Sequence, residues 1–496
     1  MEWPVAEWGV PLMTAVAAPE LAPWTRWRRE GAALARLTAA ERAETGKRLR
    51  AAVPREAHGE FSPPPGRDPV GLLLSQEQSR VPELVSVRHG RMLVSPFSYY
   101  RGAALPMAAD LAGTLATGIL VQACGDAHLS NFGLFGTPER NLVFDINDFD
   151  ETLPGPWEWD VKRLAASLEV AGRENGYSRE DRRMIARRCA ARYRAAMREF
   201  AAMSNLEVWY AQPSADELRT RLKPLLSKRQ KKVMARAVTK AQTRDSMQAV
   251  GKLTQLVDGR PRIIADPPLI VPQASLLPED LEQAGFEAQL GQLIGKYRRS
   301  LPAERRILLE QYTYVDMARK VVGVGSVGTR CWIVLFTGRD QDDPLLLQVK
   351  EAPPSALSEF AGPAAQNNQG HRVVTGQRIL QAAGDIFLGW LRAPGLDGGT
   401  YDFYVRQLRD WKYSFTIETM APDDLLYYGQ VCAWTLARGH ARSGDRIAIA
   451  AYLGGSAAFD EAISEFASAY ADQNECDYAS LGEAVSAGRV TAAQVG

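Results

Sequence analysis

Apolar and polar positions alternate along the chain in a pattern that separates strands from loops in its first third. Residues 117–124 and 141–146 are short apolar runs bounded by turn residues, which is typical of β-strands. The segment between them contains Gly133, Gly136 and Pro138, so we expect it to form a loop. The sequence therefore predicts two strands joined by a loop in this part of the chain.

Helical spacing of apolar positions follows these strands and returns towards the C-terminus. The segments with this spacing are 159–170, much of 178–255, 279–315, 373–388, 424–441 and 457–475. The clearest β pattern lies between the helical segments, at residues 320–352, and a further strand is expected at 401–408. These patterns predict an α+β protein in which one β-rich segment is flanked by helices.

The length of the chain indicates more than one domain. A chain of 496 residues is too long for one ordinary core, and two or three domains are expected. Proline-rich residues 261–278 suggest an extended connector. The predicted regions are an N-terminal helical extension (1–70), a mainly helical region (71–300), a β-rich region (301–415) and C-terminal helices (416–496).

Composition limits the classes of partner and compartment. Lys and Arg number 59 and Asp and Glu number 58, so the net charge is +1 and nothing in it calls for nucleic acid or an anionic membrane. The five cysteines are scattered without a C-x-x-C pair, which indicates reduced thiols in a cytosolic protein. The N-terminus lacks the pattern of a signal peptide, and no apolar stretch approaches about 20 residues. We therefore expect a soluble cytoplasmic protein.

A glycine-rich segment in the β-rich region matches G-x-G-x-x-G at Gly323, Gly325 and Gly328, with Ser326 inside it. In a dinucleotide-binding fold such a loop opens a helix, whereas in a protein kinase it joins two antiparallel strands. The residues that follow, 329–336, are β-branched and aromatic and favour a strand. A third strand ends at Lys350, which would supply a positive charge for phosphates. The alternative is a glycine-rich hairpin with an exposed lysine.

An acidic cluster follows the first predicted strand. Asp126 and Asn131 form D-x-x-x-x-N, the spacing at which kinases place a catalytic base and a metal-binding amide. Asp145 stands on the second predicted strand, where a second metal-binding carboxylate is expected, with Asp148 as the alternative. Asp150 and Glu151 crowd the same turn. The competing interpretation is a surface acidic turn in which Asp126 is a cap.

Three further residues bear on this cluster. Arg101 and Arg163 would reach either phosphates or the acidic cluster, although a buried Arg–Asp pair that only orients the loop is an equal alternative. We expect His440 to hydrogen-bond the loop of Asp126. A kinase helix after the lysine strand carries a glutamate that pairs with the lysine, but the expected helix at 371–383 contains no acidic residue.

The chain resembles the bacterial domain of unknown function 2252 family from about residue 70 to the C-terminus. The resemblance rests on several segments: 95–104, 125–133, 144–151, 159–164, 243–246, 376–378 and 437–445. The segment 124–131 is also similar to H-G-D-x-x-x-x-N of aminoglycoside phosphotransferases, with Cys124 in place of the histidine. Residues 436–441 are similar to the L-A-x-L-H-A helix of those enzymes, which normally precedes the catalytic loop.

Because the glycine loop and this helix come after the catalytic segment, the resemblance implies a circularly permuted, two-lobed kinase-like fold. It implies transfer of a phosphoryl group from Mg²⁺-ATP to an unknown hydroxyl on a small molecule or protein. Asp126 would be the base, Asn131 and Asp145 or Asp148 would hold Mg²⁺, and the glycine loop, Lys350 and the two arginines would bind ATP. Two alternatives stay open, a nucleotide-binding pseudokinase and a nucleotidyl transferase that transfers AMP.

Overall fold

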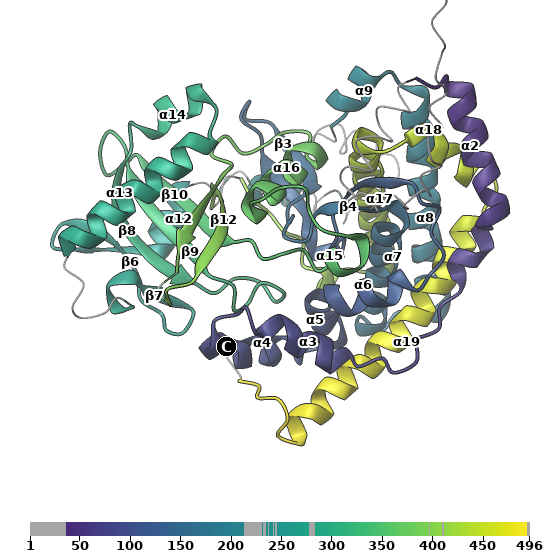
Figure 1. The fold of residues 1–496 in the computed structure, drawn as a ribbon, viewed down its shortest axis with the longest axis horizontal. Coiled ribbons are helices and arrows are strands. Elements are labelled where there is room, and N and C mark those ends of the chain that lie inside the picture. Colours follow the sequence, from purple (N-terminus) through teal and green to yellow (C-terminus); the bar gives the residue numbers. More distant parts are fainter. Residues whose placement is uncertain are drawn as a thin grey trace, which may run out of the picture.

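The computed structural model describes residues 36–212, 246–276, 283–395, 397–408 and 411–493, with isolated residues between 231 and 243. The first 35 residues of the expected N-terminal extension lie outside this description. The predicted α+β class is confirmed, since helices and antiparallel strands both form the core. Figure 1 shows a region built around a sheet on the left and a region of packed helices on the right.

The sheet region contains six antiparallel strands in the order β11-β12-β10-β9-β8-β7. Their bounds are β7 (Ile270–Pro272), β8 (Thr313–Lys320), β9 (Cys331–Thr337), β10 (Pro344–Glu351), β11 (Gly389–Pro394) and β12 (Thr400–Gln407). Lys350 on β10 stands opposite Cys331 on β9 and Tyr404 on β12. The predicted strands in 320–352 and 401–408 are thus confirmed, and the expected connector 261–278 contributes β7 instead of remaining a linker.

Alternation of side chains places apolar residues on both faces of this sheet. One face packs Val334, Phe336 and Leu345 against α13 (Gln283–Ser300) and α14 (Ala303–Leu309). The other packs Ile333 and Leu335 against α12 (Ser246–Leu253) and against the hairpin of β5 (Thr254–Val257) and β6 (Arg260–Ile263). Because both faces are covered, the β-rich segment reads as nearly continuous apolar sequence.

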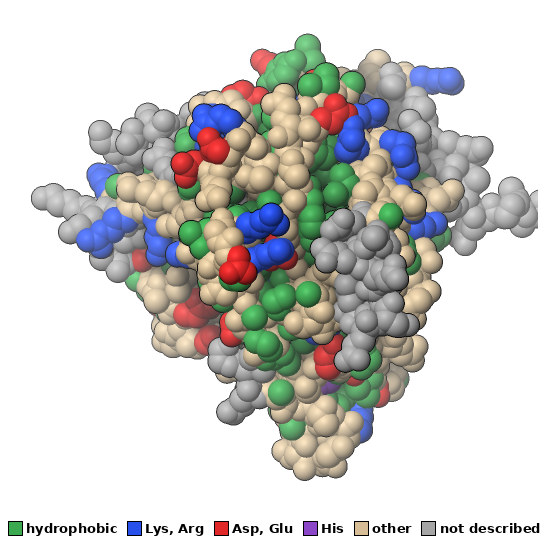
Figure 2. Space-filling model, turned by 90° about the vertical axis from the view of Figure 1, so that its left-hand side faces the viewer, with side chains coloured by type: hydrophobic (Ala, Val, Ile, Leu, Met, Phe, Trp, Pro, Cys, Tyr) green, Lys and Arg blue, Asp and Glu red, His purple; other side chains and the backbone are tan. Residues whose placement is uncertain are grey.

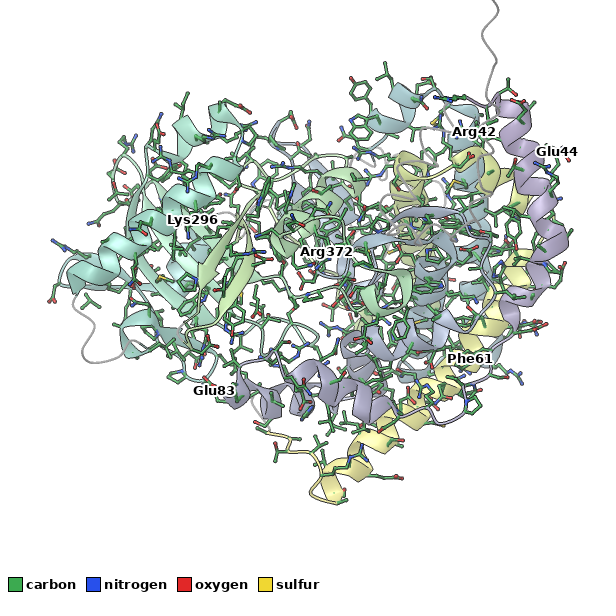
Figure 3. All side chains as sticks on the ribbon, viewed as in Figure 1. Arg42, Glu44, Phe61, Glu83, Lys296 and Arg372 are labelled. Carbon is green, nitrogen blue, oxygen red and sulfur yellow. The ribbon has the colours of Figure 1, made fainter. Side chains whose placement is uncertain are left out.

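Two helices connect β10 to β11 and lie towards the middle of the molecule: α15 (Ser358–Ala361) and α16 (Gln369–Leu380). Arg372 on α16 is buried, and it donates to Thr152 O at 2.7 Å and to Pro353 O at 2.8 Å. Figure 3 labels Arg372 where the sheet region meets the helical region. This side chain therefore joins α16 to both parts of the fold.

The helical region combines segments from both ends of the chain. Its long helices are α7 (Trp157–Glu174), α8 (Arg179–Ala202), α17 (Pro422–Ser443) and α19 (Ala458–Ser486), with α18 (Arg446–Leu453) packed on α2 (Ala39–Ala52). The shorter helices are α3 (Pro69–Glu77), α4 (Pro82–Met92), α5 (Pro96–Gly102), α6 (Ala104–Ala112) and α9 (Asn205–Tyr210). The largest apolar cluster among the described residues lies between the long helices and strands β1 to β4.

Two small antiparallel sheets lie between the two regions and carry the acidic cluster. One pairs β1 (Leu120–Ala123) with β4 (Leu153–Pro156), and the other pairs β2 (Phe132–Gly136) with β3 (Leu142–Ile146). The strands predicted at 117–124 and 141–146 are confirmed as β1 and β3. The expectation of a loop around Gly133 and Gly136 is wrong, because these glycines belong to β2. Gly133 is required there, since a Cβ would come within 2.5 Å of Tyr413 O.

The outer face of the sheet region bears both signs of charge. Figure 2 shows Lys and Arg side chains interspersed with Asp and Glu on this face, with apolar groups between them. Within the described ranges, each helix is too short or too polar to span a lipid bilayer.

Candidate functional site: a glycine loop over an acidic cluster

The glycine loop connects β8 to β9, two antiparallel strands. Gly323 and Gly328 have φ angles of 67° and 90°, which are backbone conformations that side chains disfavour. The loop therefore turns between strands and does not open a helix. This geometry argues against a dinucleotide-binding loop, in which a helix must follow the glycines.

The outer side of the loop rests on residues 80–102 of the helical region. Val81 N donates to Gly328 O at 2.8 Å, and Arg91 Nη1 donates to Gly323 O at 2.7 Å. A Cβ on Gly325 would lie 3.1 Å from the carbonyl oxygen of Arg101. The glycines thus allow two backbones to approach closely, and the loop is held down over the acidic cluster.

Asp126 lies in a turn after β1 that is fixed by the start of α7. Asp160 on α7 accepts from Cys124 N at 2.7 Å and from Gly125 N at 2.9 Å. His440 Nε2 donates to Asp160 Oδ2 at 3.0 Å. His440 therefore does not bind the loop of Asp126 directly, although this was expected. It binds Asp160, and Asp160 accepts the hydrogen bonds from the turn.

The carboxylate of Asp126, which is partly exposed, forms an ion pair with the buried Arg163. Arg163 Nε donates to Asp126 Oδ1 at 2.6 Å, and its Nη2 donates to Tyr100 O at 3.0 Å. Burial raises the pKa of Asp126, and the nearby charge of Arg163 limits this rise. Asn131 Nδ2 donates to Asp126 O at 2.9 Å, which leaves the Asn131 oxygen available as a metal ligand. Arg163 therefore pairs with Asp126. This agrees with the alternative in which the arginine orients the loop of Asp126.

Asp145 lies away from this group, contrary to the expectation that it holds metal. Arg438 Nη2 donates to both carboxylate oxygens of Asp145, and both side chains are fully buried. Ala382 N also donates to Asp145 Oδ2 at 3.1 Å. The carboxylate is engaged inside the protein, so a metal role for Asp145 is not compatible with this arrangement.

Asp148, the alternative to Asp145, lines the cavity between the acidic cluster and the glycine loop. It faces the cavity together with Asp126 and Asn131, and the hydrogen bond to its carboxylate is a long one from Asp150 N, at 3.3 Å. Burial raises the pKa of Asp148, and the charge of Asp150 adds to this effect. A nearby cation would stabilise the ionised carboxylate of Asp148 against both effects.

Asp150 binds the lysine of β10. Lys350 Nζ donates to Asp150 Oδ2, Tyr404 OH donates to Asp150 Oδ1 at 2.8 Å, and Ser326 Oγ donates to Asp150 Oδ2 at 3.1 Å. Burial alone would lower the pKa of Lys350, but the charges of Asp148 and Asp150 raise it above its ordinary value. One carboxylate thus joins the glycine loop, two strands of the sheet and the acidic turn.

These residues enclose a cavity of about 90 Å³ between the two regions. It is lined by residues from the glycine loop, the acidic cluster and the helices beneath the loop, which include Arg80, Arg101, Asp126, His128, Asn131, Asp148, Asp150, Gly323, Gly325 and Ser326. The buried Nε of Arg101 has no hydrogen-bond partner within the described residues. Gly328 and Lys350 lie beside this cavity and not in its lining.

The ligand atoms available here suit a hard cation. They are the carboxylate of Asp148 and the amide oxygen of Asn131, and Mg²⁺ is commonly held by one or two carboxylates plus phosphate oxygens. Among the described residues, no three His, Cys, Asp or Glu side chains gather into a metal cluster. The residues therefore fit a Mg²⁺ that shares its ligands with a bound phosphate, and not a metal held by the protein alone.

Sequence reasoning missed Asp160 and Arg438, and it mentioned Asp150 only as a crowding charge. Asp160 stands three residues before Arg163 at the start of the helix, and a buried helix-start carboxylate after two tryptophans is a recognisable signal. Arg438 is 293 residues from Asp145 in the chain, so no local pattern links them.

Comparison with known proteins gives a family and no nearer relative. The family model described as an uncharacterized protein conserved in bacteria, domain of unknown function 2252, matches residues 80–484. No curated protein and no solved structure matches the chain. The matched span contains the acidic cluster, the glycine loop and Arg438. The chain belongs to this family of uncharacterized bacterial proteins, domain of unknown function 2252.

Proposed function

We propose that this protein is a Mg²⁺-ATP-dependent phosphotransferase with a circularly permuted, kinase-like fold, acting on a hydroxyl group of a small molecule or protein. The observation that carries the proposal is the shared cavity of Asp126, Asn131, Asp148 and the glycine loop. These elements are about 200 residues apart in sequence, and kinase chemistry needs them within one site.

The order of elements in the sheet region supports the proposal. Strand β8, the glycine loop, β9, a turn, and β10 with Lys350 near its end follow one another as in a kinase small lobe. A helix, α16, then precedes the next two strands. The helices α7, α8 and α17 would form the large lobe, with α17 contributed from beyond the sheet region by the permutation.

The residues have distinct roles in the proposed transfer. Asp126 would orient the acceptor hydroxyl and take its proton as the hydroxyl oxygen bonds to the γ-phosphorus of ATP, while the bond from that phosphorus to the bridging oxygen breaks and ADP leaves with the electron pair. Asn131 and Asp148 would hold Mg²⁺, and the ion would neutralise charge on the phosphates. The backbone N–H groups of the glycine loop and the guanidinium of Arg101 face the phosphates. Catalysis would therefore come from positioning and charge neutralisation.

The acidic partner of Lys350 lies in the acidic turn and not on the helix that follows the lysine strand. The helix α16 carries no acidic residue, so the usual helix glutamate is absent. Asp150, two residues after Asp148, pairs with Lys350 instead. The lysine that contacts phosphates would then be positioned by the same turn that holds the metal.

The cavity is smaller than the roughly 300–1,000 Å³ of an ordinary ligand pocket. ATP would therefore enter only when the glycine loop moves away from residues 80–102. Loops that close over phosphates are common in enzymes that must exclude water. This closed arrangement is compatible with turnover if the contacts of Gly323 and Gly328 to the helical region break reversibly.

A second candidate function is nucleotide binding without turnover, as in a pseudokinase. The ion pair of Asp126 with Arg163 favours it, because the guanidinium occupies one of the two carboxylate oxygens that a base would use to take the acceptor proton. Transfer of AMP instead of phosphate is distinguished from both by the mass added to an acceptor.

The test measures release and transfer of the γ-phosphate of ATP with Mg²⁺, in wild type, Asp126→Asn and the matched surface variant Asp258→Asn. We expect loss of activity in Asp126→Asn alone. Equal activity in all three would refute the proposed role of Asp126. Tight ATP binding without turnover in the wild type would establish the second candidate, and an acceptor that gains the mass of AMP would identify a nucleotidyl transferase.

A further inference from the structure

Three arginines of the helical region form a cluster at the cavity beneath the glycine loop. This arginine cluster consists of Arg80, just before α4, Arg88 on α4 and Arg101 on α5. Figure 1 shows α4 and α5 along the lower edge of the molecule, where the sheet region meets the helical region. Arg80 and Arg101 line the cavity. Arg88 is fully buried and donates to Gln76 Oε1 at 3.1 Å, and Gln76 also lines the cavity.

The arginine cluster has no carboxylate partner in the part of the chain that the structure describes. Arg163 on the same cavity wall pairs with Asp126, but no described carboxylate lies within ion-pair distance of any member of the cluster. Burial lowers the pKa of all three members, and the charge of Arg80 lowers the pKa of Arg88 further. Desolvated positive charges without a counter-ion destabilise a protein unless an anion binds beside them.

The guanidinium group of Arg101 shows this most clearly. Within the described ranges, no group accepts a hydrogen bond from any of its three nitrogens. Its Nε is closed off from solvent, whereas Nη1 and Nη2 keep solvent-accessible surface. Because Arg101 lines the cavity, a ligand there can accept hydrogen bonds from these two terminal nitrogens.

Arg80 is fixed against one end of the glycine loop. Its Nη1 donates to Val327 O, and a Cβ on Gly328 would lie 3.0 Å from the Cβ and 3.1 Å from the Cδ of Arg80. Its Nη2 keeps solvent-accessible surface and has no acceptor among the residues described. Since Gly325 approaches the backbone of Arg101, the two guanidinium groups that line the cavity come from residues on which the glycine loop is packed.

These donors suit a phosphate better than a carboxylate. A phosphate group carries roughly two negative charges and three acceptor oxygens, so one group can bind two guanidinium groups. The planar fork of arginine matches the spacing of phosphate oxygens. A carboxylate has one charge and two oxygens, which would leave part of both guanidinium groups unpaired.

We infer that Arg80 and Arg101 form a phosphate-binding site on the helical wall of the cavity, with the charge of Arg88 behind it. The inference rests on the proposed function for its expected ligand, the phosphate chain of ATP, and it adds Arg80 and Arg88, which that function does not use. Lys350 is engaged by Asp150 and lies outside the cavity lining, so in this closed arrangement the two arginines present the unbonded N–H groups.

The experiment uses inorganic tripolyphosphate as the probe, with and without Mg²⁺. Calorimetric titration of the full chain is expected to give saturable binding, and Arg80→Met and Arg101→Met should each weaken it about tenfold or more. Arg188→Met, which removes an exposed arginine of α8 outside the cavity lining, should leave binding unchanged. No binding to the wild type, unchanged affinity in Arg80→Met or Arg101→Met, or an equal loss in Arg188→Met would overturn the inference.

The stability of Arg101→Met separates a binding role from a structural one. Its urea midpoint should equal or exceed that of the wild type, because an apolar chain replaces a desolvated charge that makes no hydrogen bond to the described residues. A lower midpoint together with lost binding would make Arg101 structural and refute the site. Arg101→Lys keeps the charge without the planar fork, so it should fold and bind with an affinity between those of wild type and Arg101→Met. Wild-type affinity in Arg101→Lys would contradict recognition by the fork.

Transfer of the γ-phosphate of ATP, measured in the same variants, tells this inference apart from the proposed function. Tripolyphosphate binding that depends on Arg80 and Arg101 in a protein without transfer would support the site and refute the proposed function. Transfer that survives both substitutions unchanged would refute the site and leave the proposed function standing. Competition then identifies the source of the phosphate. Displacement of tripolyphosphate by ATP identifies the nucleotide, and simultaneous binding of both identifies a phosphate group on the acceptor.

Discussion

Arg438 Nη2 donates to both carboxylate oxygens of Asp145, at 2.6 and 2.8 Å, in a part of the protein that water does not reach. The pair joins α17 to β3, two elements that the proposed permutation places in one lobe. Removing one partner of such a pair leaves an uncompensated buried charge, which costs about 3–5 kcal/mol.

We therefore predict that Arg438→Met lowers the free energy of unfolding by about 3–5 kcal/mol. Urea denaturation followed by circular dichroism measures it. Arg339→Met is the matched control, because Arg339 pairs with Asp340 on the exposed surface and should contribute less than about 1 kcal/mol. A loss in Arg438→Met no larger than in this control would show that the buried pair does not stabilise the fold.

The contrast between Asp145 and Asp148 shows how far sequence reasoning reached. Both carboxylates follow the same apolar run, and their spacing from Asp126 fits a kinase almost equally well. The deciding contact comes from Arg438, far along the chain, and no single-sequence pattern predicts such a pair. The strands, the glycine loop and the lysine strand followed from local periodicity. Strand β2 did not, because its two glycines resemble a turn, although Gly133 is required by the close backbone of Tyr413 and Gly136 lies against the side chain of Trp411.

Substitution of Asp148 should affect mainly activity, whereas substitution of Asp145 should affect mainly stability. Asp148→Asn is expected to remove most of the phosphotransfer activity. It should also lower the affinity for Mg²⁺ by more than the roughly 10–100-fold that is typical when a residue hydrogen-bonded to a metal ligand is replaced. Its unfolding free energy should stay within about 1 kcal/mol of wild type, since the one hydrogen bond that the described residues give its carboxylate is a long one. Activity against Mg²⁺ concentration and urea denaturation measure the two effects.

Asp145→Asn provides the comparison for that prediction. It should destabilise the protein strongly, because Arg438 would lose its counter-charge. If Asp145→Asn proved stable and inactive while Asp148→Asn stayed active, the metal would have to be reassigned to Asp145.

Asp150 is predicted to position Lys350. Asp150→Asn removes the charge that faces Lys350 Nζ, so the lysine is free to turn and the affinity for ATP should fall about tenfold, with a smaller change in kcat. Tyr404→Phe is the matched control, since it removes one hydrogen bond to Asp150 and leaves its charge. KM and kcat for ATP separate the two variants. Equal KM in wild type and Asp150→Asn would show that Lys350 needs no such partner.

His58 gives a prediction for the pH dependence of stability. Its Nε2 lies 2.7 Å from Tyr452 OH, and that hydroxyl donates to Val53 O at 2.9 Å, so Nε2 must carry the proton of the neutral ring. Its Nδ1 is buried without a partner among the described residues. Burial, together with the charge of Lys162, lowers the pKa of His58 to about 3.

A histidine in the unfolded chain takes up a proton below about pH 6.5, whereas His58 in the folded protein does so only near pH 3. The unfolded state therefore binds more protons between these values, and stability falls as the pH falls through this window, by at most roughly 1.4 kcal/mol per pH unit. His58→Phe should remove this contribution, so that its stability relative to wild type rises by about 2 kcal/mol as the pH falls from 7.5 to 5. Urea midpoints at pH 7.5 and pH 5 measure the difference. A constant difference between wild type and His58→Phe at both pH values would show that His58 titrates normally in the folded protein.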